Sequence, residues 1–145
     1  MLPKTTLPTT APLGGTLLRV SLGTMYLAHA GLKYFVFTPA GTAGFFESVG
    51  VAPFLAYATI AAEAIGGFML IAGFYTRITA LALIPILLGT ILFVHGANGW
   101  QFGAEGGGWE YPAFLIAASV VQALIGGGAY ALRRSPFLVG HARLA

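Results

Sequence analysis

Apolar residues fall into four long runs along the chain, separated by short polar or glycine-rich connections. Each run approaches the roughly 20 residues that an α-helix needs to cross a bilayer. We therefore predict four membrane-spanning helices, over residues 13–37, 51–73, 78–95 and 110–132. The connection between the second and third runs is so short that these two helices must be antiparallel. The expected fold is all-α: an integral membrane four-helix bundle, antiparallel, with up-down-up-down topology.

The segments between and beside these runs are short. Residues 1–12, rich in proline and threonine, predict an irregular N-terminal arm, and residues 133–145 predict a cytoplasmic tail. Residues 42–50 cannot span a membrane, and the pair Phe45–Phe46 beside Glu47 indicates a segment lying at the membrane interface. Residues 96–109, rich in glycine and containing both tryptophans, predict an outer loop.

Composition excludes several classes of protein. With 57% hydrophobic and 8% charged residues, the chain is too apolar for an ordinary soluble domain. The net charge of +3 comes from thinly spread Lys and Arg residues, so nucleic acid is not an expected partner. The absence of cysteine excludes disulfides, thiolate catalysis, Cys-ligated zinc and Cys-ligated iron–sulfur clusters.

Positive charge predicts the orientation in the membrane. With an even number of spans, both termini and the short turn at Arg77 lie on one side. That side would carry most of the Lys and Arg residues, namely Lys4, Arg77, Arg133, Arg134 and Arg143. The opposite side would carry Glu47, Glu105 and Glu110. We therefore expect a multi-pass protein of a bacterial or archaeal plasma membrane, with both termini in the cytoplasm.

Two charged residues lie deep inside the predicted spans. Arg19 belongs to a stripe on the first span that also contains Tyr26 and Lys33, and Glu63 lies among small residues on the second span. Counting the rise per residue places Arg19 and Glu63 at similar depths, so we predict an ion pair between them. Two interpretations stay open. The pair could clamp the helices in register, or Glu63 could carry a proton or contact a ligand while Arg19 holds it in place.

Polar and aromatic residues gather toward the outer end of the predicted bundle. Each has an ordinary explanation: Lys33 could extend its amine to the interface, and the Trp and Tyr residues could form an aromatic belt. As a set they could line a pocket for a polar headgroup, such as a quinone, whose carbonyls need hydrogen-bond donors. The candidate pocket residues are Tyr26, His29, Lys33, His95, Trp100, Glu110 and Tyr111.

Haem and metal sites have weaker support. His29 and His95 could in principle ligate a haem, but their predicted depths differ by about 10 Å and no other haem-ligand feature accompanies them. His95 with Glu105 or Glu110 has no recognisable metal-ligand spacing, and His141 lies outside the predicted bundle. We therefore expect no haem and no metal site.

The chain resembles the DoxX family of small four-helix membrane proteins. The resemblance covers about residues 15–132 and rests on Arg19 with Gly23, on Gly31-Leu32-Lys33, on the stretch from Glu63 to Arg77, and on Glu110-Tyr111. It implies a plasma-membrane protein associated with terminal quinol oxidases, thiosulfate:quinone oxidoreduction or redox-stress complexes. It does not by itself imply an activity.

Three functions are consistent with these observations. The first, which we favour, is a non-catalytic subunit or anchor of a quinone-linked redox complex. The second is a quinone-binding oxidoreductase that acts with a soluble redox partner, with Glu63 as proton carrier. The third is a small transporter or channel whose polar axis is Arg19, Glu63 and Lys33, for which four helices would have to form a homo-oligomer.

Overall fold

The computed structural model describes residues 10–133 and 135, and this part of the chain is helical with no β-strand. The all-α prediction is therefore confirmed. The α-helices are α1 (Ala11–Gly31), α2 (Pro39–Ser48), α3 (Phe54–Ala72), α4 (Thr76–Thr90) and α5 (Glu110–Ile125). Two π-helical turns, η1 (Leu32–Val36) and η2 (Ile91–His95), extend α1 and α4, and a short 3₁₀ turn, η3 (Gly96–Asn98), follows. The charges Lys4, Arg134 and Arg143, together with His141, lie outside the described residues.

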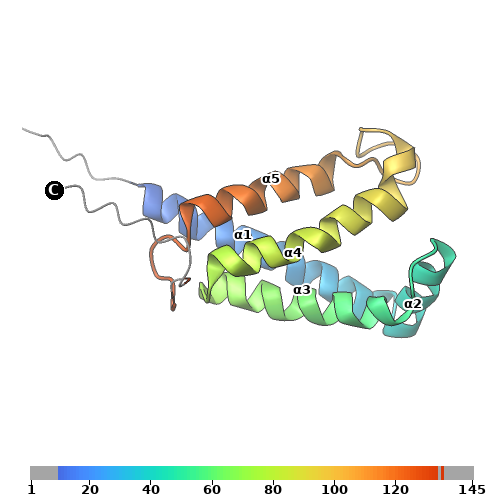
Figure 1. Ribbon diagram of the computed structural model, residues 1–145, viewed down its shortest axis with the longest axis horizontal. Coiled ribbons are helices and arrows are strands. Elements are labelled where there is room, and N and C mark those ends of the chain that lie inside the picture. The colour runs from blue at the N-terminus through green and yellow to red at the C-terminus, as the bar shows by residue number, and fades with distance from the viewer. Residues whose placement is uncertain (1–9, 134, 136–145) are drawn as a thin grey trace, which may run out of the picture.

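The four longer helices lie lengthwise against one another, and the short helix α2 lies at one end (Figure 1). Helix α1 packs against α3 and α5, and α4 packs against α3 and α5. Buried apolar side chains from all four helices form one core: Leu22, Tyr26, Leu70, Ala80, Leu83, Leu87, Leu115 and Ala118. Helix α2 contacts α3 and η1, so it covers the end of the α1–α3 pair.

Glycines bring α1 and α3 into close backbone contact. A Cβ atom on Gly23 would lie 2.7 Å from the carbonyl oxygen of Gly67, and a Cβ on Gly67 would lie 2.9 Å from that of Gly23. Neither position can accept a larger side chain without moving a helix. Small residues at such crossings let membrane helices approach closely, and here they fix the register of α1 on α3.

A tight turn joins α3 to α4. Gly73 ends α3 in the left-handed conformation, with φ 71°, and Tyr75 precedes α4 with φ 48°. From this turn the two helices run back along each other and diverge toward their other ends (Figure 1). The space between the diverging ends is part of the site described below.

Apolar periodicity does not predict where some of the helices begin or end. The fourth predicted span continues to residue 132, but α5 ends at Ile125 because Gly126 adopts φ 83° and turns the chain away. Helix α2 begins at Pro39, before the predicted interface segment 42–50, because Thr38 Oγ1 accepts a hydrogen bond from Gly41 N at 3.1 Å and caps the helix.

Two helical stretches are long and apolar enough to cross a membrane, Phe54–Ala72 and Thr76–Asn98, and α5 is a shorter apolar helix. Many large apolar side chains on these elements point outward, among them Phe68, Leu92 and Leu124, which are 66%, 74% and 70% exposed. An outer surface of this composition is typical of helices that face lipid.

The contact between Gly23 and Gly67 gives a first prediction. We expect Gly23→Ala to destabilise the protein by about 1–3 kcal/mol, because the added methyl group collides with α3. Gly31→Ala is the matched control on the same helix, since nothing lies within 4 Å of its Cβ position. The measurement is thermal unfolding in one detergent, and equal unfolding temperatures for the two variants would contradict the prediction.

Candidate functional site

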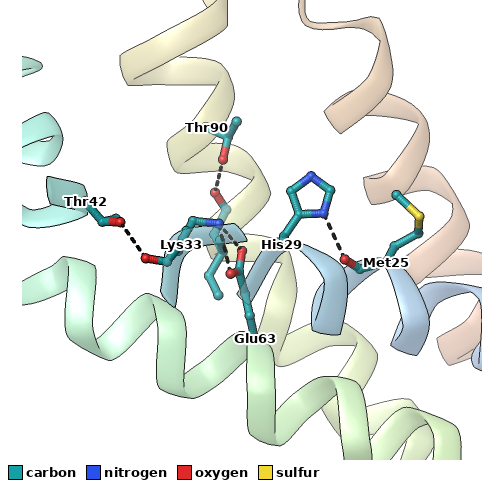
Figure 2. A network of polar contacts seen from close by, with 7 residues as sticks. Met25, His29, Lys33, Thr42, Glu63 and Thr90 are labelled. Carbon is teal, nitrogen blue, oxygen red and sulfur yellow. Dashed lines mark hydrogen bonds and ion pairs between the residues drawn. The ribbon is translucent and has the colours of Figure 1, made fainter. Parts of the chain in front are cut away.

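An ion pair joins the π-helical turn η1, which extends α1, to the middle of α3. Lys33 Nζ lies 2.8 Å from Glu63 Oε1 and 2.9 Å from Oε2, so it donates to both carboxylate oxygens (Figure 2). The Glu63 side chain is 4% exposed, whereas that of Lys33 is 20% exposed. The carboxylate is thus enclosed, and the amine keeps limited access to the surface of the structure.

Helix geometry brings these two side chains together. Side chains in an α-helix point toward the helix N-terminus. Since α1 and α3 run in opposite directions (Figure 1), Lys33 reaches back along α1 while Glu63 reaches the other way along α3. Along the axis of the helix pair, the two long side chains therefore meet at a point between the backbone of Lys33 and the backbone of Glu63. Lys33 lies on the π-helical turn η1, whose wider backbone is a frequent feature of functional sites.

The predicted ion pair between Arg19 and Glu63 is wrong. Arg19 is buried, and its guanidinium donates to backbone carbonyls near the opposite end of α3 and after α5: Leu70, Ile71, Gly127, Ala129 and Tyr130. Leu70 lies about 10 Å along the helix axis from Glu63. The prediction counted the depth of Arg19 from the inner membrane face, where its span was expected to begin, and the depth of Glu63 from the opposite face, about 30 Å away. In the structure α1 begins beyond the end of α3 at Gly73, so Arg19 lies beside Leu70 and Ile71 and not beside Glu63.

Arg19 and Arg77 both satisfy carbonyls at helix ends. The last carbonyls of an α-helix have no partner within the helix and carry partial negative charge. Arg19 Nη1 donates to Leu70 O at 2.9 Å, and Arg77 Nη1 donates to Ala123 O and Leu124 O at 2.6 and 2.8 Å. The sequence predicts Arg77 in a cytoplasmic turn. In the structure Arg77 lies in the first turn of α4, and its side chain caps the C-terminal end of α5.

The Lys33–Glu63 pair forms part of the wall of a cavity of about 930 Å³, which we call the inner cavity. Its lining is mainly apolar and comes from α1, α2, α3, α4, both π-helical turns and the start of α5. The predicted pocket residues Tyr26, His29, Lys33, His95 and Tyr111 all line it. The hydroxyl of Tyr111 is buried and has no hydrogen-bond partner among the described residues.

A second, more open cavity of about 1040 Å³ adjoins the first, and we call it the outer pocket. Trp100 and Glu110 line it together with Phe102 and Phe114. His29, His95 and Tyr111 line both cavities, so these three side chains form a shared wall. The structure thus brings all seven predicted pocket residues to two adjoining cavities, and their binding role stays a prediction.

The two histidines on the shared wall have similar surroundings. His29 Nδ1 lies 2.8 Å from Met25 O (Figure 2), and His95 Nδ1 lies 2.9 Å from Gly107 O. A carbonyl oxygen only accepts hydrogen bonds, so Nδ1 carries the hydrogen in each neutral ring and Nε2 keeps its lone pair.

Among the described residues, no group of three or more His, Cys, Asp or Glu side chains could hold a metal ion.

Sequence reasoning missed several parts of the site. Thr42 on α2 donates to the carbonyl of Lys33 at 3.2 Å, which ties α2 to the π-helical turn that carries the ion pair (Figure 2). Phe45 and Phe46 line the inner cavity, although their pattern predicts only a membrane interface. The two π-helical turns have no sequence signal, since apolar periodicity does not distinguish one wide turn within a helix.

The sequence matches a known family and a known protein. The sequence profile of the DoxX family matches residues 14–96. A relative from Bacillus subtilis (strain 168), named "Putative oxidoreductase CatD", is 34% identical over 126 residues, which cover 87% of each chain. No solved structure matches the chain.

The unequal exposure of the two charges gives a second prediction. We expect Lys33→Met to destabilise the protein by about 3–5 kcal/mol, because it leaves the enclosed Glu63 carboxylate without its partner. Glu63→Gln should cost less, since the partly exposed Lys33 amine can turn toward the surface. The double variant should recover part of the loss.

Thermal unfolding of the four proteins measures this coupling as a double-mutant cycle. Glu47→Gln is the control, since Glu47 is exposed on α2 and its substitution should leave stability unchanged. Additive effects of Lys33→Met and Glu63→Gln would contradict an energetically important pair.

Proposed function

The chain belongs to the DoxX family of membrane proteins, and from this premise we propose that it is a membrane subunit of a quinone-linked redox complex and binds the quinone in the inner cavity. The observation that carries the proposal is the buried Lys33–Glu63 pair on the wall of a large apolar cavity. An ionisable pair surrounded by apolar side chains commonly marks a site for protons or a polar ligand group.

The proposed topology has α1, α3, α4 and α5 crossing a bacterial or archaeal plasma membrane in alternating directions, with both termini in the cytoplasm. The apolar outer surfaces of these helices support it. The charge distribution supports the orientation, because Arg77 and Arg133 lie near the α3–α4 turn while Glu47, Glu105 and Glu110 belong to the segments at the other end.

The residues of the inner cavity fit a quinone by size and chemistry. Pockets that enclose whole organic ligands measure about 300–1,000 Å³, and the inner cavity lies at the upper end of this range. Three groups can donate to carbonyl oxygens. Lys33 has a third N–H beyond the two directed at Glu63, and the hydroxyls of Tyr26 and Tyr111 have no hydrogen-bond partner among the described residues.

The cavity also has room for an apolar tail. Phe37, Phe45 and Phe93 line it and are 58%, 48% and 52% exposed, so this part of its wall continues into the outer surface of the protein. In a bilayer that surface would contact lipid. A membrane quinone could therefore place its ring beside Lys33 and extend its isoprenoid chain past these phenylalanines into the membrane.

A bound quinone would supply two-electron chemistry coupled to protons. In that setting Lys33 would orient a carbonyl oxygen, Glu63 would hold or release a proton beside it, and the apolar lining would exclude water. The chain contains no cysteine and so no thiol redox group of its own, and we assign electron transfer to a partner protein. The relative's name, which describes an oxidoreductase, supports a redox role.

Quinone binding to the purified protein in nanodiscs tests the proposal. We expect a menaquinone or ubiquinone analogue to bind, and Lys33→Met to weaken binding by about tenfold or more, because a hydrogen bond from a charged donor is lost. Since Lys33→Met also affects stability, a second variant is needed. Gly89 lines the inner cavity, and nothing lies within 4 Å of its Cβ position. The larger side chain of Gly89→Leu should therefore fill the cavity and abolish binding.

Gly31→Leu is the matched control for Gly89→Leu. Gly31 is also a helical glycine with open space at its Cβ position, but it does not line either cavity. Binding that survives Gly89→Leu, or a protein that binds no quinone at all, would contradict the proposal.

A further inference from the structure

The outer pocket has its own chemistry, distinct from that of the Lys33–Glu63 pair. Aromatic rings from the outer loop and α5 surround it, including Trp100, Phe102 and Tyr111. They take part in two aromatic contacts, in which Trp100 packs edge-on against Trp109 at 4.6 Å between centroids and Phe102 packs edge-on against Tyr111 at 6.0 Å. The faces of such rings carry partial negative charge and attract cations.

One carboxylate lies in this aromatic setting. Glu110 Oε1 accepts a hydrogen bond from Phe102 N at 2.9 Å, which holds the carboxylate beside the rings. The other carboxylate oxygen forms no hydrogen bond with the described residues. Neither Lys nor Arg is among the described residues that line the outer pocket, so the negative charge of Glu110 has no cationic side chain beside it there.

The two histidines add hydrogen-bond acceptors. The Nδ1 atoms of His29 and His95 face backbone carbonyls, so each neutral ring keeps the lone pair of Nε2 for another partner. Both side chains line the outer pocket. Its polar groups are therefore mostly acceptors, whereas those of the inner cavity include the cationic donor Lys33.

We propose that the outer pocket binds the primary ammonium group of an organic amine, with the charge on Glu110 and the ring faces of Trp100 and Tyr111, and with N–H groups directed to the imidazole Nε2 atoms. An ammonium group carries a positive charge and three N–H donors, which match a carboxylate, aromatic faces and lone pairs together. This site does not depend on the proposed quinone function. The amine could belong to a soluble molecule or to an ethanolamine lipid headgroup.

Binding of 2-phenylethylamine tests the proposal directly. The probe is titrated into the full-length protein in phosphatidylcholine nanodiscs and followed by calorimetry. 2-Phenylethanol, which has a similar shape and no charge, is the neutral comparison. We expect the amine to bind and the alcohol to bind at least about tenfold more weakly.

Two substitutions locate the site. Glu110→Gln removes the charge but keeps an amide oxygen that can accept from Phe102 N, so we expect about tenfold weaker amine binding with little change in folding. Trp100→Leu should also weaken binding, by several-fold. Glu105→Gln is the matched control for Glu110→Gln, because Glu105 lies in the loop that precedes α5, is exposed and does not line the pocket.

A second lipid composition distinguishes the two sources of the amine. If the ligand is a lipid headgroup, nanodiscs containing phosphatidylethanolamine should prevent binding of the soluble probe to the wild-type protein. If the ligand is a soluble amine, the probe should bind equally in both lipids. Equal affinity for the amine and the alcohol, full binding to Glu110→Gln, or no amine binding in phosphatidylcholine would each overturn the proposal.

Discussion

Every charge within this apolar helix assembly has to find its partner inside the protein, and the rest of the structure depends on that constraint. An unpaired charge in apolar surroundings costs several kcal/mol, more than most single packing contacts contribute. Glu63 meets the requirement with Lys33, and Arg19 meets it with backbone carbonyls. These contacts link α1 to α3 at two levels and to the segment after α5. Polar side chains thus hold together helices whose apolar surfaces would be equally well solvated by lipid.

The close contact of α1 and α3 connects this constraint to the site. Gly23 and Gly67 allow the two backbones to meet and leave little freedom for one helix to slide along the other. With the register fixed, the N-terminal tilt of side chains on two antiparallel helices brings Lys33 and Glu63 together. The α3–α4 pair diverges from its tight turn instead, which leaves room for the inner cavity beside the ion pair. Close packing on one side of α3 and separation on the other therefore create the site.

Two cavities of different chemistry meet at a wall formed by His29, His95 and Tyr111. The inner cavity is apolar and has a charged donor, which suits a lipid-soluble carbonyl compound. The outer pocket has aromatic faces, a carboxylate and acceptors, which suit a cationic amine.

The sequence by itself determined that the chain is helical and apolar, because the period of the apolar residues depends only on local sequence. It also determined which charged residues lie within the apolar helices and need a partner there, because a buried charge is costly. It also indicated seven of the residues that line the two cavities, but not, for example, Phe45 and Phe46. It could not determine their partners. The depth of Arg19 or Glu63 can be counted only along its own helix, and their pairing depends on how far α1 is displaced along α3. The tertiary structure alone decided that displacement, through the glycine contact, and with it the pairing of Lys33 with Glu63. The early end of α5 and the two π-helical turns were also decided there, because backbone conformation at single residues leaves no trace in apolar periodicity.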